Sequence, residues 1–164
     1  MKRTTIISWN VNGIRAVAKK GFSKWLEQAN PDMLCLQETK AHPDQLEEIL
    51  RHPNGYTGLW NAAEKKGYSG VATLVKEKPL SEMSHFGDPI LDGEGRIILT
   101  EHPAFFLFNV YFTNGKRDHE RLAFKLAFYE KFLNLAQSFR KKKPIVFCGD
   151  INTAHHPIDL ARPK

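Results

Sequence analysis

Four short apolar runs of this sequence each end in side chains that carry oxygen. The polar segments that follow them occupy positions 10–13, 37–40, 111–115 and 149–152. A single run that ends in an amide or a carboxylate is ordinary turn chemistry, because Asn, Asp and Gly favour turns. Four such runs are more informative, because the polar ends of strands in a layered sheet can converge on one rim. The pattern therefore predicts one shared site at the ends of four strands.

Two carboxylates, Glu38 and Asp150, and the amides of Asn10 and Asn152 form a set of hard oxygen donors. The set contains no thiolate and no paired histidines, so it suits Mg²⁺ or Mn²⁺ better than Zn²⁺. Mg²⁺ keeps several waters and takes one or two protein carboxylates, which leaves positions for a substrate phosphate. These donors predict a phosphoryl-transfer site with Mg²⁺ or Mn²⁺ as its cofactor.

The alternation of side chains along a β-strand adds a geometric expectation. Asn10 and Asn12 lie on one face if their strand continues, and so do Asp150 and Asn152. In such a site a carboxylate can orient and deprotonate a water, while amide N–H groups hold the phosphoryl oxygens. Tyr111 can either donate its hydroxyl to the phosphate or stabilise charge as a phenolate, if its pKa is lowered.

The elements that must position these residues alternate along the chain. Strands are expected at 5–9, 32–36, 56–60, 70–75, 97–100, 104–112 and 145–148, where β-branched and aromatic residues lie between turn formers. Several of these runs are apolar at consecutive positions, as strands covered on both faces are. Helices are expected at 22–29, 43–50 and 118–141. Strands that alternate with helices predict an α/β or α+β layered domain, and no linker or repeat divides positions 1–164.

The long helix at 118–141 has apolar residues on most of its circumference. Its expected buried stripe consists of Leu122, Leu126, Tyr129, Leu133 and Ala136, which Phe124, Phe128, Phe132, Leu135 and Phe139 widen. The basic residues at 140–143 are interpreted as cations favoured at a helix C-terminus rather than as a nucleic-acid patch. Pro144 follows them as a stop signal. We expect this helix to cover a sheet.

Composition excludes several classes of protein. The 164 residues are 41% hydrophobic and 26% charged, which supports a packed core and excludes disorder of the chain as a whole. No apolar run approaches the ~18 residues that span a bilayer, and the N-terminus lacks the apolar core of a secretory signal, so we expect a cytoplasmic protein without a membrane partner. Lys and Arg exceed Asp and Glu by 24 to 18, a net charge of +6 that is compatible with a polyanionic partner. Cys35 and Cys148 lie in apolar runs and are expected to be buried thiols.

Six segments of the sequence resemble the exonuclease III family of abasic-site endonucleases in their order and spacing. They are S-W-N-V-N-G-I-R-A at 8–16, L-C-L-Q-E-T-K at 34–40, G-Y-S-G-V-A at 67–72, G-E-G-R-I at 93–97, Y-F-T-N-G at 111–115 and G-D-I-N-T-A-H at 149–155. The match extends over the whole chain. The resemblance implies the deoxyribonuclease I-like endonuclease/exonuclease/phosphatase fold, a four-layer α/β sandwich of two packed sheets. It also implies a monomer for a complete member of the family.

The resemblance implies a role for each matched residue. Glu38 would be the principal metal ligand, with Asn10 beside it and with Asp150 and Asn152 as further ligands. Asp150 would position and deprotonate the attacking water, and Asn152 would bind the scissile phosphate. Tyr111 would contact that phosphate close to the developing charge. The remaining matched positions are expected to bind substrate: Asn12, Arg15, Lys40, Tyr68, Asn114 and Arg117.

The implied function is that of a DNA-repair nuclease acting on double-stranded DNA. With Mg²⁺ it would hydrolyse the phosphodiester bond 5′ of an abasic site and would remove nucleotides from 3′ ends as a 3′-to-5′ exonuclease. Two alternatives stay open: a fragment or half-domain that binds DNA with little or no catalysis, and a phosphatase or phosphodiesterase of the same fold.

The single domain at 1–164 is expected to be incomplete at its C-terminus, because it matches somewhat over half of a family member. Strands of both sheets and the family's C-terminal Asp-His element would then be absent. Loss of one transition-state donor alone lowers a rate ~10²–10³-fold. We therefore expect the chain by itself to be poorly active or inactive.

Overall fold

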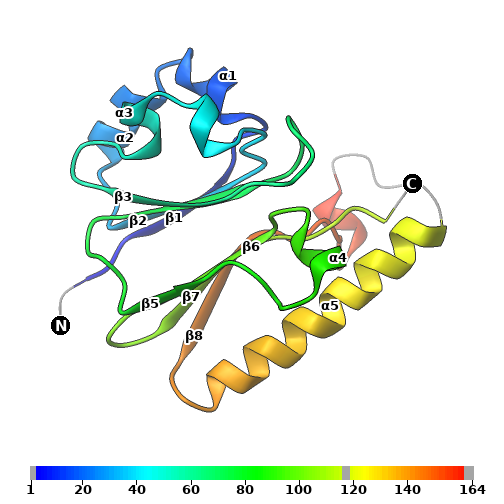
Figure 1. Cartoon of the computed structure of the whole chain (residues 1–164). Coiled ribbons are helices and arrows are strands. Elements are labelled where there is room, and N and C mark those ends of the chain that lie inside the picture. Colours follow the sequence, from blue (N-terminus) through cyan, green and yellow to red (C-terminus); the bar gives the residue numbers. More distant parts are fainter. Residues whose placement is uncertain (1–2, 116–118, 161–164) are drawn as a thin grey trace.

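The computed structural model describes residues 3–115 and 119–160. Two four-stranded sheets face each other, and helices lie on the outer side of each, so the described residues form a four-layer α/β sandwich (Figure 1). This arrangement confirms the fold class expected from the sequence. No helix among the described residues is long and apolar enough to cross a membrane.

The first sheet has the strand order β1-β2-β4-β3. Its strands are β1 (Ile6–Asn10), β2 (Met33–Gln37), β3 (Thr57–Asn61) and β4 (Val71–Val75). β1 and β2 run parallel, whereas β4 is antiparallel to both of its neighbours. Every residue of β2 and β4 is buried, because helices cover one face of the sheet and the second sheet covers the other. The parallel pair brings Asn10 and Gln37 to the same edge.

The second sheet has the strand order β5-β6-β7-β8. Its strands are β5 (Ser81–Met83), β6 (Ile97–Glu101), β7 (Phe106–Tyr111) and β8 (Ile145–Asp150). β7 and β8 run parallel and place Tyr111 opposite Asp150. The short strand β5 was not expected, because its three residues carry no run of β-branched or aromatic side chains. β8 lies at the edge of this sheet, where Val146 and Phe147 are exposed.

Short helices cover the first sheet, and one long helix covers the second (Figure 1). They are α1 (Ile14–Ala18), α2 (Phe22–Ala29) and α3 (Glu48–Arg51) over the first sheet, with α4 (Pro89–Asp92) and α5 (His119–Arg140) against the second. The helix expected at 22–29 is confirmed, whereas the one expected at 43–50 is interrupted: it begins as a 3₁₀ turn, and α3 starts only at Glu48. A 3₁₀ turn, η1 (Pro43–Gln45), ends at Leu46, whose backbone is extended and whose side chain is buried in the core. A second 3₁₀ turn, η2 (Pro157–Asp159), follows β8.

The buried face of α5 differs from the expected stripe. Leu122, Leu126 and Leu133, which were expected inside, are 44%, 59% and 57% exposed. Three other members of that stripe are buried as expected: Ala136, Phe128 and Phe132, the last two because their rings pack edge-on against aromatic rings in and after β7. Aromatic packing therefore selects the face that the helix turns to the sheet.

A buried polar contact joins the two sheets beneath the rim where the predicted site residues lie. Gln37 Nε2 donates to Asn109 Oδ1 at 2.8 Å, and Asn109 Nδ2 donates to the carbonyl oxygen of Ala72 at 2.8 Å. Both side chains are excluded from solvent. Gln37 directly precedes Glu38, and Asn109 lies two residues before Tyr111 on β7. The contact therefore fixes the position of Glu38 on the first sheet relative to Tyr111 on the second.

The two cysteines face the layer between the sheets. Cys35, on β2, is buried and Cys148, on β8, is half-buried; both are free thiols. This agrees with the expectation that they are structural thiols, although Cys148 is less covered than expected because β8 is an edge strand.

Candidate active site

The polar ends of β1, β2, β7 and β8 meet at one rim of the sandwich. Because β1–β2 and β7–β8 are parallel pairs, their carboxyl ends lie at the same edge of each sheet. Asn10 joins the two edges, since its Nδ2 donates hydrogen bonds of 2.8 Å to Glu38 Oε1 and of 2.8 Å to Asp150 Oδ2. The convergence of four strand ends predicted from the sequence is present in the structure.

Glu38 and Asp150 supply the carboxylate oxygens of this rim. Each carboxylate accepts a hydrogen bond from Asn10 with one of its oxygens. The second oxygen of Glu38 pairs with Lys40 Nζ at 2.8 Å. The second oxygen of Asp150 accepts the Asn152 N–H at 3.0 Å. Across residues 3–115 and 119–160, no three His, Cys, Asp or Glu side chains cluster as a metal site. Two carboxylates beside amides suit Mg²⁺ or Mn²⁺, which keep waters and bind substrate phosphate, better than Zn²⁺, which favours Cys and His ligands.

Asn10 and Asp150 end their strands in the same way. The side-chain oxygen of each accepts the backbone N–H two positions further on, from Asn12 and Asn152, at 3.0 Å in both cases. Asn12 and Asn152 take left-handed backbone conformations, with φ of 46° and 52°, which Asn tolerates better than most residues. The strands therefore end at Asn10 and Asp150, before they reach Asn12 and Asn152. The condition for placing each pair on one strand face, that the strand continues, is not met. Asn10 turns its oxygen to the backbone and its nitrogen to the two carboxylates.

Tyr111 adds a hydroxyl donor to the two carboxylates. Burial of its ring, together with the charge of Glu38 and a hydrogen bond to it, raises the pKa of Tyr111 to about 12. The hydroxyl therefore keeps its proton at neutral pH and can donate to a phosphoryl oxygen. This protonation state favours the hydroxyl-donor alternative over the phenolate, which needs a lowered pKa.

Glu38 is ionised at neutral pH. Burial alone would raise its pKa, but hydrogen bonds from Asn10, Lys40 and Tyr111 outweigh that effect and hold the pKa below its ordinary value. A permanently charged carboxylate is the form that a divalent cation requires. The electrostatics of Glu38 therefore match the role of metal ligand expected for it.

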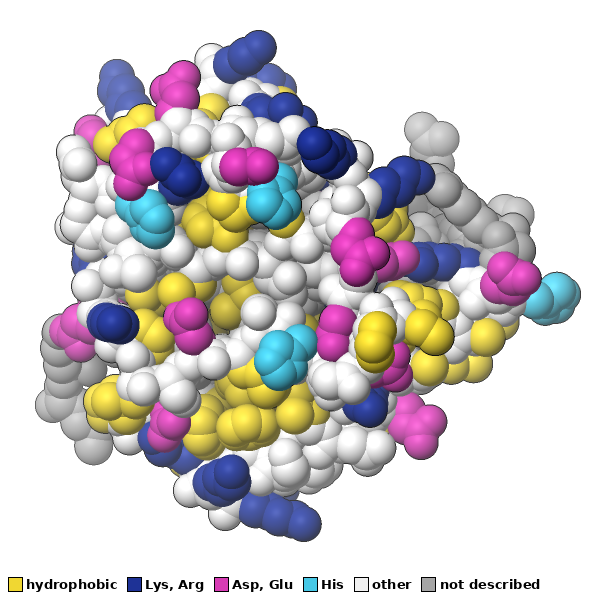
Figure 2. Space-filling view, in the orientation of Figure 1, with side chains coloured by type: hydrophobic (Ala, Val, Ile, Leu, Met, Phe, Trp, Pro, Cys, Tyr) yellow, Lys and Arg dark blue, Asp and Glu magenta, His cyan; other side chains and the backbone are white. Residues whose placement is uncertain are grey.

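A cavity of about 590 Å³ opens beside Glu38 and Tyr111. Four cationic and two anionic side chains line it: Lys40, Lys65, Arg96 and Arg121 against Glu38 and Glu94. The positive excess favours a phosphate-bearing ligand. Beyond the cavity, Lys and Arg side chains stand over the layer formed by α1–α3 (Figure 2), where Arg15, Lys19 and Lys20 are exposed.

Lys40 and Arg15 extend the site along the rim of the first sheet. The Lys40 ammonium contacts the Glu38 carboxylate and the side-chain oxygen of Asn12, so it joins two of the predicted site residues. Arg15 is exposed on α1, and its guanidinium donates to the carbonyl oxygen of Lys40 at 3.4 Å. Both cations are therefore placed where a nucleic-acid backbone could reach them.

Three further predicted positions lie in or beside the cavity. Tyr68 and Asn114 line it. The Asn152 amide nitrogen donates to the carbonyl oxygen of Phe112 at 2.9 Å, which holds this side chain beside the end of β7. Arg117, the last predicted substrate contact, lies outside the described residues.

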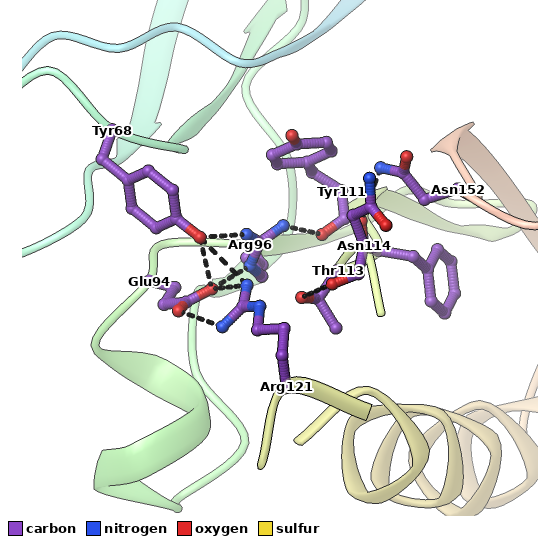
Figure 3. Close-up of polar contacts among 9 residues, drawn as sticks. Tyr68, Glu94, Arg96, Tyr111, Thr113, Asn114, Arg121 and Asn152 are labelled. Atoms are coloured by element: carbon purple, nitrogen blue, oxygen red, sulfur yellow. Dashed lines mark hydrogen bonds and ion pairs between the residues drawn. The ribbon is translucent and has the colours of Figure 1, made fainter. Parts of the chain in front are cut away.

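Glu94, Arg96 and Arg121 form a charged cluster in the cavity wall that received no role from the sequence. The Glu94 carboxylate accepts from both guanidiniums over distances of 2.6–2.7 Å (Figure 3). A signal was available in Gly95, which separates Glu94 from Arg96. Its φ is 58°, and a Cβ there would lie 2.5 Å from the backbone of Ala62. A carboxylate and a cation that flank a glycine which no other residue can replace indicate a turn that brings the two charged side chains together.

Comparison with known proteins extends over most of the chain. Residues 7–164 match the Endonuclease/Exonuclease/phosphatase family. An exodeoxyribonuclease of Bacillus subtilis is 41% identical over 160 residues, which are 97% of this chain and 62% of that protein. A DNA-(apurinic or apyrimidinic site) endonuclease of Dictyostelium discoideum is 40% identical over 161 residues, 97% of this chain and 44% of that protein.

A solved structure shows the same arrangement of elements. The APE2 catalytic domain of Xenopus laevis superposes with a TM-score of 0.88 at 30% identity, over 98% of this chain and 62% of that one. The chain thus spans between 44% and 62% of the length of these three proteins.

Proposed function

Because the chain belongs to the endonuclease/exonuclease/phosphatase family, we propose that its site hydrolyses phosphodiester bonds of duplex DNA with Mg²⁺ or Mn²⁺. The bonds would be those 5′ of abasic sites and those at 3′ ends. The observation that carries this proposal is the bridge from Asn10 to both Glu38 and Asp150, because it gathers carboxylates from two sheets at the mouth of a cationic cavity. The names of the relatives, an exodeoxyribonuclease and an abasic-site endonuclease, support the same substrate class.

Glu38 and Asp150 would hold the divalent cation, with the amides of Asn10 and Asn152 beside them. The bound cation would supply neutralising charge to the scissile phosphate. The lowered pKa of Glu38 supports this assignment, because it keeps the carboxylate charged at neutral pH despite partial burial.

Asp150 would orient the attacking water and accept its proton. The hydrogen bonds that it accepts from Asn10 and from the Asn152 N–H fix the plane of its carboxylate, so little reorientation is needed before proton transfer. Tyr111 would donate its hydroxyl to the phosphoryl oxygen on which negative charge grows. A donor placed in advance at that oxygen stabilises the transition state more than the ground state.

The DNA backbone would be held by the cations around this centre. Lys40, Tyr68 and Asn114 line the cavity, and Arg15 lies next to Lys40. Asn12 and Arg117 complete the proposed substrate contacts. Such contacts position the duplex and make binding depend on salt, without selecting a base sequence.

The proposal is tested by single-turnover incision, with the chain in excess over a duplex that carries one abasic-site analogue. We expect slow incision 5′ of the analogue with Mg²⁺, no incision with EDTA, and a rate lowered a further ~10²-fold or more in Asp150→Asn. Asp44→Asn is the matched control, because Asp44 is an exposed aspartate in η1 and should leave the rate unchanged. Retention of DNA without metal-dependent cleavage would favour the non-catalytic alternative, and incision that survives EDTA would contradict the proposal.

A further inference from the structure

Arg96 carries a buried guanidinium directly before β6, with a side chain only 2% exposed. Its Nε donates to Glu94 at 2.6 Å, its Nη1 to the carbonyl oxygen of Tyr111 at 2.9 Å and its Nη2 to the hydroxyl of Tyr68 at 3.1 Å. Burying a charge is costly unless partners satisfy it, and here all three nitrogens have acceptors within the protein. Arg96 therefore does not reach substrate, so its effect must pass through the residues that it holds.

Tyr111 is the residue that Arg96 contacts most extensively. The Tyr111 N–H donates to the carbonyl oxygen of Arg96 at 2.8 Å, in addition to the bond from Nη1 to the Tyr111 carbonyl. The guanidinium carbon lies 4.4 Å from the centroid of the Tyr111 ring, a cation–π contact. The Arg96 side chain thus holds Tyr111 at its carbonyl and at the face of its ring, and the Arg96 backbone holds its amide. Figure 3 shows Arg96 between Tyr68 and Tyr111.

Glu94 fixes the direction of Arg96 in turn. Its Oε1 accepts from Arg121 Nη1 at 2.6 Å, and its Oε2 accepts from Arg121 Nη2 at 2.7 Å and from Arg96 Nε. Burial alone would raise the pKa of Glu94, but the hydrogen bonds from Arg121 and the charge of Arg96 outweigh it and lower that pKa. Because Arg121 lies in the first turn of α5, the carboxylate ties the helix to the turn before β6.

From these contacts we infer that Arg96 is a positioning residue, anchored by Glu94, that sets the ring of Tyr111 so that its hydroxyl is directed to the scissile phosphate. The role given to the Tyr111 hydroxyl rests on the proposed function, whereas the contacts by which Arg96 positions the Tyr111 ring are independent of it. A lysine could not replace Arg96, because a single ammonium nitrogen cannot serve three acceptors in these directions and also lie flat against the ring.

Kinetics test the role through a double-mutant cycle. We expect Arg96→Met to lower the single-turnover incision rate at saturating enzyme about 10-fold or more, with DNA affinity changed less than about 2-fold. Arg96→Lys should recover little of the rate. In a Tyr111→Phe background the same Arg96→Met change should cost less than about 3-fold, because the hydroxyl that it positions is gone. Equal costs in both backgrounds would overturn the inference.

Spectroscopy tests the hold on the ring without any activity. In protein labelled at the tyrosine rings, the Tyr111 signal is assigned from its loss in Tyr111→Phe, and we expect it to shift in Arg96→Met and in Glu94→Gln. Arg140→Met, which removes an exposed arginine at the end of α5, is the control and should leave the signal in place. Glu94→Gln keeps the side-chain volume, so it still gives an answer if Arg96→Met fails to fold.

The two measurements separate the inference from the proposed function. If the unmodified chain does not cut DNA while the Tyr111 signal shifts as expected, the proposed function fails and the hold on the ring stands. If the chain cuts DNA and the signal does not move in either variant, the inference is wrong and the proposed function stands.

Discussion

The side-chain amide of Asn10 donates a hydrogen bond of 2.8 Å to Asp150, a residue 140 positions away on the other sheet. The same nitrogen donates to Glu38, so one amide lies between two carboxylates. The arrangement follows from two parallel strand pairs whose carboxyl ends meet at one rim. Without this donor the two carboxylates would lose the hydrogen bonds that join them, and each would keep only its remaining partners, among them Lys40 and the Asn152 N–H.

Asn10→Ala should therefore destabilise the protein. We expect the free energy of unfolding to fall by about 1–3 kcal/mol at neutral pH, because two carboxylates lose a hydrogen-bond donor. Urea unfolding with and without Mg²⁺ measures the effect, and the loss should be smaller with Mg²⁺, since a cation between the carboxylates also screens them. Asn134→Ala, an exposed amide on α5, should change the free energy by less than about 0.5 kcal/mol. A loss of the same size in both solutions would argue against a cation at this position.

Glu94→Gln should lower stability in a way that depends on pH. The pKa of Glu94 is lowered in the folded protein, so the carboxylate stabilises the fold above its unfolded pKa, and this contribution is lost as the pH falls through the folded pKa. We expect the variant to lose about 3 kcal/mol at neutral pH, because two guanidiniums lose their anion. The gap should narrow as the pH drops below 4.5, the ordinary value for this group.

Urea unfolding over a series of pH values tests this expectation. Glu130→Gln, which changes an exposed glutamate of α5, should follow the unmodified chain at every pH. A gap between Glu94→Gln and the unmodified chain that stays constant with pH would contradict the assigned ion pairs.

Asn109→Leu should be among the more damaging single changes to the interior. The leucine has a similar size, but it leaves Gln37 Nε2 and the carbonyl oxygen of Ala72 buried without the partner that Asn109 provides. We expect a loss of about 2–4 kcal/mol in the free energy of unfolding, measured by urea denaturation. If stability is unchanged or rises, the amide contact between the sheets does not hold them together.

The framework of this site could be predicted because it depends on local patterns. Consecutive apolar residues mark β2 and β4 as strands covered on both faces, and polar residues at the ends of parallel strands meet by geometry. The buried face of α5 could not be predicted, because apolar residues surround the helix and only the aromatic rings of the second sheet decide between Leu126 and Phe128. Arg96 was missed for a similar reason, since its partners Glu94, Tyr68 and Tyr111 come together only in the fold.

Tyr111 should resist ionisation in the folded protein. Burial and the charge of Glu38 raise its pKa to about 12, so the neutral phenol persists through the range in which ordinary tyrosines titrate. In the metal-free chain we expect the tyrosinate absorbance of Tyr111→Phe to match that of the unmodified chain up to about pH 10.5. Circular dichroism over the same range confirms that the fold is retained. A lower absorbance in the variant near pH 10 would show that Tyr111 ionises normally and would revive the phenolate alternative.

The most direct measurement is a titration of Mn²⁺ into the isotopically labelled chain, followed by broadening of backbone amide signals. We predict that one equivalent broadens the signals at the ends of β1, β2, β7 and β8 together, and that Glu38→Gln weakens this binding about 10-fold or more at all four. Broadening confined to the strand ends of one sheet, or unchanged in Glu38→Gln, would contradict a single cation shared by the two sheets.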